Sequence, residues 1–229
     1  MTLPISVIIL KHRDDARLRD CVASVGWASE VKAVENKIAI SDFAQVRNDA
    51  LHEIKHDWVF FVDSDEVVDE ATPKLLEPLL NQPNISGMTV KRVDIFLGKE
   101  LHWGEVGNVR LLRIMKKNSA HFERAVHEVA KVEGNTIDSG IILRHYAHQS
   151  VSEFLQKIIF YIQIEAQLRA KNGERFQLWQ LLLYPPAKFF VNYFLKLGFL
   201  DGWRGLIYAT MMSIHSAGVR ATLYEKNHS

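Results

Sequence analysis

The stretch that decides the fold is DWVFFVDSDEVVDE, residues 57–70, in which an apolar run ends abruptly in acidic residues. Residues 58–62 have the length and the aromatic and β-branched composition of a buried strand. Asp63, Asp65 and Glu66 follow that strand within four residues. The segment is therefore either an acidic turn or a place where the fold presents negative charge to a cation. The sequence on either side of it distinguishes the two possibilities.

The chain before this stretch alternates between strand and helix patterns. Residues 3–10 are almost continuously apolar, which predicts a strand buried on both faces, as in a parallel sheet. Residues 31–35 predict a second, shorter strand, and Ser41-Asp42 predicts the start of the helix before residue 58. The order strand, helix, strand, helix, strand predicts an α/β fold with right-handed crossovers.

The chain after this stretch changes character at Gly87. The segments GMTVKRVDIF, GNVRLLRIM and VHEVAKVE alternate between apolar and polar residues, which predicts antiparallel strands and hence a mixed sheet. Ser150 and Glu153 form a capping box that predicts a long helix to about Lys171. Five apolar residues are predicted to form the buried side of this helix: Phe154, Leu155, Ile158, Ile159 and Ile162.

The last part of the chain is rich in Leu, Phe, Tyr and Trp and poor in charge. From Ala187 onward, helical spacing places Lys188, Asn192 and Lys196 on one narrow polar stripe. This pattern predicts an amphipathic helix in a membrane interface, with lysines that reach the head groups and aromatic side chains at the boundary. A helix packed on the globular core or in a homodimer is the alternative.

These patterns divide the chain into three parts. We expect a catalytic α/β domain over residues 1–149, a long capped helix over 150–175, and membrane-interface helices over 176–229. The sheet of the first part is expected to be mixed and flanked by helices.

Composition excludes several classes of protein. The 28 basic and 27 acidic residues leave a net charge of +1, which argues against nucleic acid as the main partner. Cys21 is the single cysteine, so no intrachain disulfide can form and a reducing compartment is expected. The basic residues near the amino terminus follow the apolar run, whereas a secretory signal carries them before it. We therefore expect a cytoplasmic protein that is attached peripherally to the inner face of the membrane.

The acidic residues after the predicted strand suggest a cation site. Ligands bind at the carboxyl ends of strands in open α/β sheets, and residues i and i+2 of an extended chain point the same way. Asp63 and Asp65 could therefore approach one Mg²⁺ or Mn²⁺, ions that bind proteins through one or two carboxylates and substrate phosphates. A calcium EF-hand loop is excluded because Val67 and Val68 stand where an oxygen ligand and a glycine are required.

Several blocks in the right order resemble one known family. The blocks ISVIILKHRDDARLRDCVASVGWASEV, SDFAQVRNDAL, DWVFFVDSDE, AVHEVAKVEG, LRHYAHQSVSEFLQK and GFLDGWRGL are similar to family-2 glycosyltransferases of the GT-A fold, nearest to the lipopolysaccharide-core β-1,4-glucosyltransferases. The resemblance implies a nucleotide-sugar donor, usually UDP-linked, an inverting transfer, and a lipid-linked or lipopolysaccharide-type acceptor.

The resemblance also implies roles for individual residues. Asp63 would lie near the ribose and the metal, and Asp65 would bind the Mg²⁺ or Mn²⁺ that bridges the diphosphate. Glu128 matches the base that removes the proton from the acceptor, with Glu105 as runner-up. His145 stands where GT-A enzymes place a histidine on the metal or diphosphate. An ordinary strand-edge carboxylate at Glu128 and a structural role for His145 are the alternatives.

Basic residues are expected at the nucleotide. Arg47 matches a position where the family has a basic residue near the donor, although a solvated helix arginine is the alternative. Arg110 and Arg113 are three residues apart, so in a regular strand they face opposite ways, and one would hold a phosphate while the other is solvated.

The chain departs from the family pattern after its second predicted strand. The family usually has an Asp-Ser-Gly-Ser-x-Asp block there, followed by a helix and a third strand. About fifteen residues of this stretch are missing, and Glu35 stands in place of the first carboxylate. This departure keeps two alternatives open: a degenerate, non-catalytic binding protein, and a metal-dependent nucleotidyltransferase on a related sheet.

Overall fold

The structure is a computed structural model, and it divides into two compact units. It describes residues 2–11, 16–35, 43–123 and 129–228. The first unit consists of residues 1–92 and 109–146, and the second of residues 93–108 and 147–229. Each unit is described in turn.

The first unit is built on a sheet that begins with three parallel strands. β1 (Leu3–Lys11) pairs in parallel with β2 (Ala28–Glu35) on one side and with β3 (Trp58–Asp63) on the other. Successive apolar residues of β1 enter two different core clusters, Val7 and Ile9 on one face and Ile8 on the other. The strand is therefore buried on both faces, as its continuous apolar run predicts.

The rest of the sheet is antiparallel. β7 (Val109–Lys116) pairs with β3 and with β5 (Ile85–Phe96), and β10 (Asn135–His148) pairs with β4 (Glu66–Val68). The strand order is β2-β1-β3-β7-β5-β10-β4. The predicted mixed α/β sheet is confirmed.

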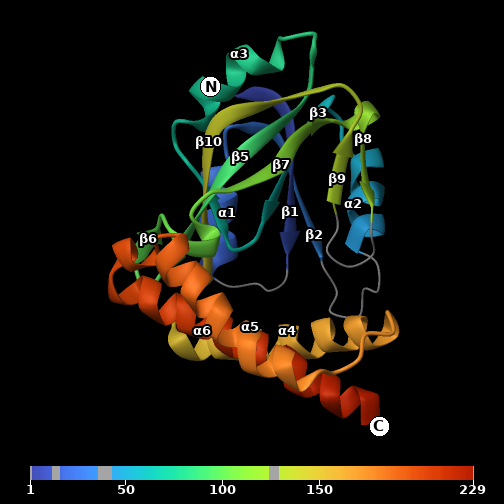
Figure 1. Ribbon diagram of the computed structural model, residues 1–229. Helices are drawn as coiled ribbons and strands as arrows, with labels where there is room; N and C mark the ends of the chain where they lie inside the picture. The colour runs from blue at the N-terminus through green and yellow to red at the C-terminus, as the bar shows by residue number, and fades with distance from the viewer. Residues whose placement is uncertain (1, 12–15, 36–42, 124–128, 229) are drawn as a thin grey trace. The chain divides into compact units, whose positions relative to one another are not determined.

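Helices and one hairpin cover the two faces of this sheet (Figure 1). α1 (Ala16–Ser24) and α3 (Thr72–Leu80) contribute Cys21 and Leu76 to one core cluster. α2 (Phe43–His52) packs on the other face, together with a hairpin of β8 (Ala120–Glu123) and β9 (Val129–Val132). The hairpin is a separate two-stranded sheet.

The second unit is mainly helical. β6 (Lys99–Leu101) pairs with the end of β5, and a 3-10 turn follows at Gly104–Val106. The helices are then, in chain order, α4 (Val151–Lys171), α5 (Leu178–Phe190), a π-helical turn (Val191–Leu195), a 3-10 turn (Gly198–Asp201) and α6 (Trp203–His228). α6 packs against both α4 and α5.

α4 begins where the capping box predicts. The hydroxyl of Ser150 accepts a hydrogen bond from Glu153 N at 3.0 Å, and the Glu153 carboxylate accepts one from Gln149 N at 3.0 Å. The buried residues follow one another four apart, at Phe154, Ile158, Ile162 and Ala166. The prediction that Ile159 is buried is wrong: its side chain is 60% exposed because it lies one residue beyond this stripe.

The first two members of the polar stripe predicted after Ala187 face the protein, because Lys188 and Asn192 both bind the carboxylate of Glu105. The helix begins at Leu178 and continues through Pro185 and Pro186, and a π-helical turn follows it, so that the spacing of a regular helix is lost. Lys188 Nζ lies 2.8 Å from Glu105 Oε1, and Asn192 is 2% exposed. The prediction that Lys188 reaches lipid head groups is therefore wrong, because it pairs with a carboxylate of its own unit.

Within the part of the chain that the structure describes, no helix combines the length and the apolar character that crossing a membrane requires.

Candidate functional site

The acidic stretch lies where β3 ends and the chain turns back into β4. Asp63 is the last residue of β3, beside Leu10 of β1, and Ser64 N donates to Leu10 O at 3.1 Å. Ser64 and Asp65 form the turn, and Glu66 begins β4. The extended spacing assumed for Asp63 and Asp65 is therefore wrong, since the strand ends at the first of them.

Two arginines hold the carboxylate of Asp63. Arg113 Nη2 of β7 lies 2.6 Å from Asp63 Oδ2, and Arg47 Nη2 of α2 lies 3.4 Å from Asp63 Oδ1. Burial alone would raise the pKa of Asp63, but the guanidiniums of Arg113 and Arg47 hold it well below its ordinary value. Asp63 is thus a fixed negative charge whose oxygens both face cations of the protein.

Glu66 completes this ion cluster from the buried side. Its side chain is fully buried, and its carboxylate accepts hydrogen bonds from Asp63 N at 2.8 Å and from Arg113 Nη2 at 3.1 Å. Burial raises the pKa of Glu66, and the charge of Arg113 opposes that rise only in part. Glu66 therefore holds both the backbone of the turn and the arginine that faces Asp63.

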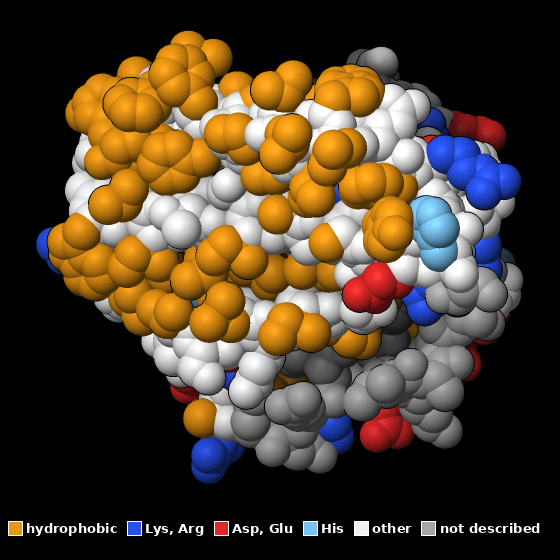
Figure 2. Space-filling view, turned by 60° about the horizontal axis from the view of Figure 1, so that its bottom comes forward, with side chains coloured by type: hydrophobic (Ala, Val, Ile, Leu, Met, Phe, Trp, Pro, Cys, Tyr) orange, Lys and Arg blue, Asp and Glu red, His pale blue; other side chains and the backbone are white. Residues whose placement is uncertain are grey.

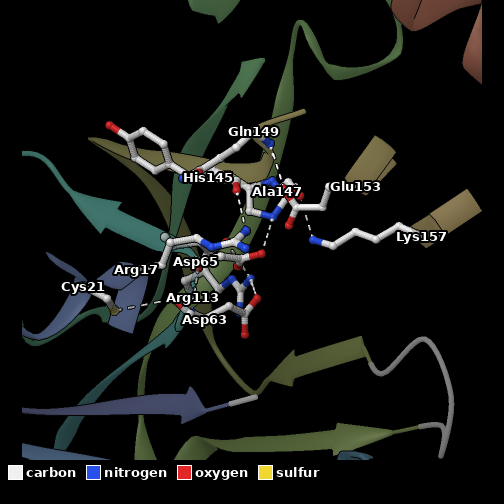
Figure 3. A network of polar contacts seen from close by, with 12 residues as sticks. Arg17, Cys21, Asp63, Asp65, Arg113, His145, Ala147, Gln149, Glu153 and Lys157 are labelled. Atoms are coloured by element: carbon white, nitrogen blue, oxygen red, sulfur yellow. Dashed lines mark hydrogen bonds and ion pairs between the residues drawn. The ribbon is translucent and has the colours of Figure 1, made fainter. Parts of the chain in front are cut away.

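Asp65 faces a different partner. Its Oδ2 atom lies 3.6 Å from His145 Nε2, and Tyr146 N donates to Asp65 O at 2.8 Å. Arg17 of α1 donates to Tyr146 O at 3.2 Å. Figure 3 shows the side chains of Arg17, Arg113 and His145 gathered around Asp63 and Asp65. The pairing of β4 with β10 sets this contact, because it aligns His145 with Glu66, next to Asp65.

The donor set around Asp65 fits a hard divalent cation only in part. Within the described ranges, no group of three or more His, Cys, Asp and Glu side chains is arranged to hold a metal ion. Asp65 and His145 lie close enough to share one ion, and their side chains are 21% and 16% exposed. Mg²⁺ commonly takes one or two protein ligands and completes its shell with phosphate oxygens and water. The pair therefore fits a cation that arrives with a phosphate ligand.

Cys21 is buried beneath this turn, with its thiol 3.5 Å from Asp63 O. Burial and the carboxylates of Glu66, Asp63 and Asp65 raise the pKa of the thiol to about 12. Cys21 is thus a neutral core residue and not a nucleophile.

The remaining predicted residues are not all at this turn. Arg110 pairs with Asp138, and its side chain is 44% exposed. Of the two arginines on β7, Arg113 is therefore the one that contacts Asp63 at the turn. Glu35 is the exposed last residue of β2. Glu128 lies outside the described residues. Glu105 belongs to the second unit, where its carboxylate accepts hydrogen bonds from Lys188 and from Asn192 Nδ2.

Sequence reasoning missed Arg17 and Asn48. Arg17 stands in a charged run, RDDARLRD, that gives no sign of which arginine faces the turn. Asn48 follows Arg47 on α2, and its side-chain amide binds the backbone of Phe122. Only the tertiary structure identifies either contact.

Comparison with known proteins adds one full-length relationship. No protein-family model matches the chain. The chain is 25% identical to the lipopolysaccharide core biosynthesis glycosyltransferase LpsC of Rhizobium meliloti (strain 1021), over 258 residues that cover 98% of this chain and 93% of the relative. This distant homology confirms the resemblance to lipopolysaccharide-core glycosyltransferases.

Among solved structures, the chain is similar to the crystal structure of S. aureus TarS residues 1–349, with a TM-score of 0.43 and 10% identity over 99% of this chain and 91% of that one. A second similar structure is that of the same TarS fragment in complex with UDP-GlcNAc, with a TM-score of 0.40 and 12% identity over 99% of this chain and 92% of that one.

Proposed function

We propose that the protein is a glycosyltransferase that moves a hexose from a nucleotide sugar, most simply a UDP-sugar, to a lipid-linked or lipopolysaccharide-type acceptor. The observation that carries this proposal is the relationship to LpsC over 98% of the chain. The position of Asp63 and Asp65 at the carboxyl end of a central parallel strand supports it, since open α/β sheets bind their ligands there.

The charges at the turn suit a diphosphate that arrives with a cation. Arg47 and Arg113 are already engaged by the acidic side chains of Asp63 and Glu66. In the proposed site, Asp65 and His145 hold a Mg²⁺ or Mn²⁺, which when bound supplies positive charge against the negative charge of the departing nucleoside diphosphate. Arg17, beside Tyr146, adds a further cation on this side of the turn.

The proposed reaction is a single inverting displacement. The acceptor hydroxyl oxygen forms a bond to the anomeric carbon of the sugar while the bond from that carbon to the diphosphate oxygen breaks. The bonding electrons leave with the nucleoside diphosphate, and the carboxylate of Glu128 takes the proton of the hydroxyl. Glu105 is retained as the alternative base.

Replacement of Asp65 tests this assignment. The variant Asp65→Ala should lose sugar transfer and Mn²⁺-dependent binding of UDP in calorimetric titration, because it removes the carboxylate that faces His145. Asp49→Asn is the matched control, since Asp49 is an exposed carboxylate on α2 that contacts Gln45. Full activity of Asp65→Ala would contradict the proposed site, and UDP binding without any sugar transfer by the unaltered protein would favour the degenerate binding protein.

We further propose that the second unit attaches the protein to a membrane surface. Large apolar side chains are exposed along its helices, and Figure 2 shows such side chains spread over one face with few charges among them. Among the described residues of this unit, the large apolar side chains that are more than half exposed are Ile159, Phe160, Leu178, Leu182, Leu183, Phe190, Leu195, Leu200 and Trp203. α5 packs against α6, yet most of its side chains, from Leu178 to Tyr184 on one side, remain at least partly exposed.

The charges of this segment favour an anionic lipid surface as the partner. Residues 176–229 carry five Lys and Arg against two Asp and Glu. Exposed basic residues flank the apolar helices at Lys171, Arg175, Lys196 and Lys226. Aromatic and aliphatic side chains with a basic border are typical of proteins that lie in the interface of an anionic membrane.

A flotation experiment with vesicles of phosphatidylethanolamine and phosphatidylglycerol tests the attachment. The full chain should float with the vesicles, and the double variant Leu182→Glu, Leu195→Glu should not. Both residues are more than 60% exposed, so the fold should tolerate the substitutions. Val22→Glu on α1 of the first unit, where the side chain is 41% exposed, is the matched control. A full chain that sediments as a dimer and never floats would assign the surface to a second copy instead.

Substitution is a sharper test than deletion of residues 176–229. Met211 and Val219 of α6 belong to the core cluster that also contains Phe154 and Ile158 of α4. Deletion would therefore expose the core of the second unit and would confuse unfolding with loss of binding.

A further inference from the structure

A small hollow lies in the second unit beside Trp103. The residues that line it include Leu101 of β6, Trp103 and Gly104 just after it, Asn192 of the π-helical turn and Tyr208 of α6. The hollow is partly open to solvent and has room for about one water-sized group. It therefore cannot enclose a whole ligand, but it can receive a single polar group of a ligand that lies over it.

The polar group that fits the hollow is a hydrogen-bond donor. Asn192 is 2% exposed, and its Nδ2 atom donates to Glu105 Oε2 at 3.2 Å and to Lys188 O at 3.1 Å. Its Oδ1 atom is buried and accepts no hydrogen bond from any residue that the structure describes. A Cβ atom placed on Gly104 would lie 3.9 Å from this oxygen, so the oxygen borders the hollow at Gly104. Because a buried carbonyl oxygen without a donor is costly, a hydroxyl group that enters here is stabilised.

Trp103 provides an apolar surface next to the hollow. The carboxylate of Asp201 accepts hydrogen bonds from His102 N at 3.1 Å and from Trp103 N at 2.9 Å. Gly104 N, the next along the chain, donates to Lys196 O at 2.9 Å. The backbone on both sides of the indole is thus fixed, yet Trp103 remains 40% exposed. An exposed aromatic ring on a fixed backbone can bind a ligand at little cost in conformational entropy.

The charges around the hollow favour a neutral, hydroxyl-rich ligand over an anion. The carboxylate of Asp201 lines the hollow, and the carboxylate of Glu105 lies behind Asn192. Lys188, the basic residue nearest to Glu105, is already engaged by that carboxylate at 2.8 Å. A sugar ring meets both requirements of the site, because its C–H face packs on an aromatic ring and its hydroxyl groups donate hydrogen bonds.

We propose that Trp103 and this hollow bind a hexopyranose unit of the acceptor glycan. The C–H face of the sugar lies on the indole, and one hydroxyl group enters the hollow and donates to Asn192 Oδ1. Asp201 is a positioning residue that acts through Trp103. The inference rests on the proposed function for the identity of the ligand as the acceptor, whereas the binding of a hexose can be measured without any transfer.

Titration of the full chain with simple sugars, followed by saturation-transfer NMR, tests the proposal. The probes are methyl glucopyranoside, methyl galactopyranoside and methyl mannopyranoside. At least one of them should bind, and Trp103→Ala should weaken its binding by roughly 10-fold or more, because the stacking surface is lost. Trp179→Ala is the matched control: Trp179 is 48% exposed in the same unit and does not line the hollow, so sugar binding should be unchanged. Absence of binding by all the probes, or equal binding by the unaltered protein and Trp103→Ala, would overturn the proposal.

Deoxy sugars test the hydroxyl group without any change to the protein. Among the monodeoxy forms of the sugar that binds best, one should bind roughly 10-fold more weakly, because it leaves Asn192 Oδ1 buried without a donor. Equal binding by all of these forms would show that the hollow takes no hydroxyl group. Trp103-dependent binding by a protein that transfers no sugar would overturn the proposed function and leave a site that binds glycans. Transfer without such binding would overturn the site and leave the proposed function.

Discussion

Arg113 is predicted to be the residue on which the folded state of the acidic turn depends most. It is the counterion of both Asp63 and Glu66, and its own side chain is 11% exposed. The substitution Arg113→Met keeps the length and the packing of the side chain and removes the charge. Glu66 would then be a fully buried carboxylate that has lost its arginine, and Asp63 would keep the longer contact to Arg47.

The expected loss follows from the burial of Glu66. Removing one partner of a buried ion pair costs about 3–5 kcal/mol, because the remaining charge stays buried without compensation. Since about 1 kcal/mol moves the unfolding temperature of a domain of this size by about 2–4 °C, we expect a fall in Tm of roughly 6–20 °C. Thermal unfolding followed by circular dichroism measures it.

A double variant tests whether the uncompensated carboxylate of Glu66 causes the loss of stability. In Arg113→Met, Glu66→Gln the buried charge is gone, so this protein should be more stable than Arg113→Met alone. Arg110→Met on the same strand is the control, because Arg110 is exposed and an exposed pair contributes at most about 1 kcal/mol. An Arg113→Met protein with unchanged Tm, or a double variant that recovers nothing, would refute the reasoning.

Two further predictions concern the helices of the second unit. Ser150→Ala should lower the free energy of unfolding by about 1 kcal/mol, because Glu153 N loses its cap; urea denaturation measures this, and Ser152→Ala is the control. Gly205→Ala should cost about 1–3 kcal/mol or more, since the new Cβ would lie 1.9 Å from Gly198 O and the start of α6 would have to move. Gly26→Ala, where the nearest atom lies at 3.6 Å, should change Tm much less, and equal shifts in the two glycine variants would contradict the close packing.

The central strands and the capped helix could be predicted because local sequence determines them. β1 and β3 are continuous apolar runs, and Ser150 with Glu153 marks the start of α4 within one turn of chain. The opposite orientation of Arg110 and Arg113 also followed from strand geometry alone, and the structure agrees. These features need no knowledge of distant partners.

The contacts that the sequence did not predict involve partners that lie far away in the chain. Lys188 was expected at a lipid surface, but its ammonium group donates a hydrogen bond to Glu105, which lies 83 residues earlier in the chain. The prediction that the side chains of Asp63 and Asp65 point the same way is wrong, because β3 ends at Asp63. Hydrogen bonds from Ser64 N to Leu10 O and from Asp63 N to Glu66 fix that end of the strand. Asn48 gave no signal, since its partner is a backbone and not a side chain.

The most direct test of the proposed function is hydrolysis of the donor without any acceptor. Purified protein is incubated with a panel of UDP-sugars, with and without Mn²⁺, and the release of UDP is followed by mass spectrometry. The account predicts slow release of UDP from at least one UDP-hexose, dependent on Mn²⁺ and lost in Asp65→Asn, which leaves His145 without its carboxylate partner. Release that persists unchanged in Asp65→Asn, or release of pyrophosphate from a nucleoside triphosphate in its place, would contradict it.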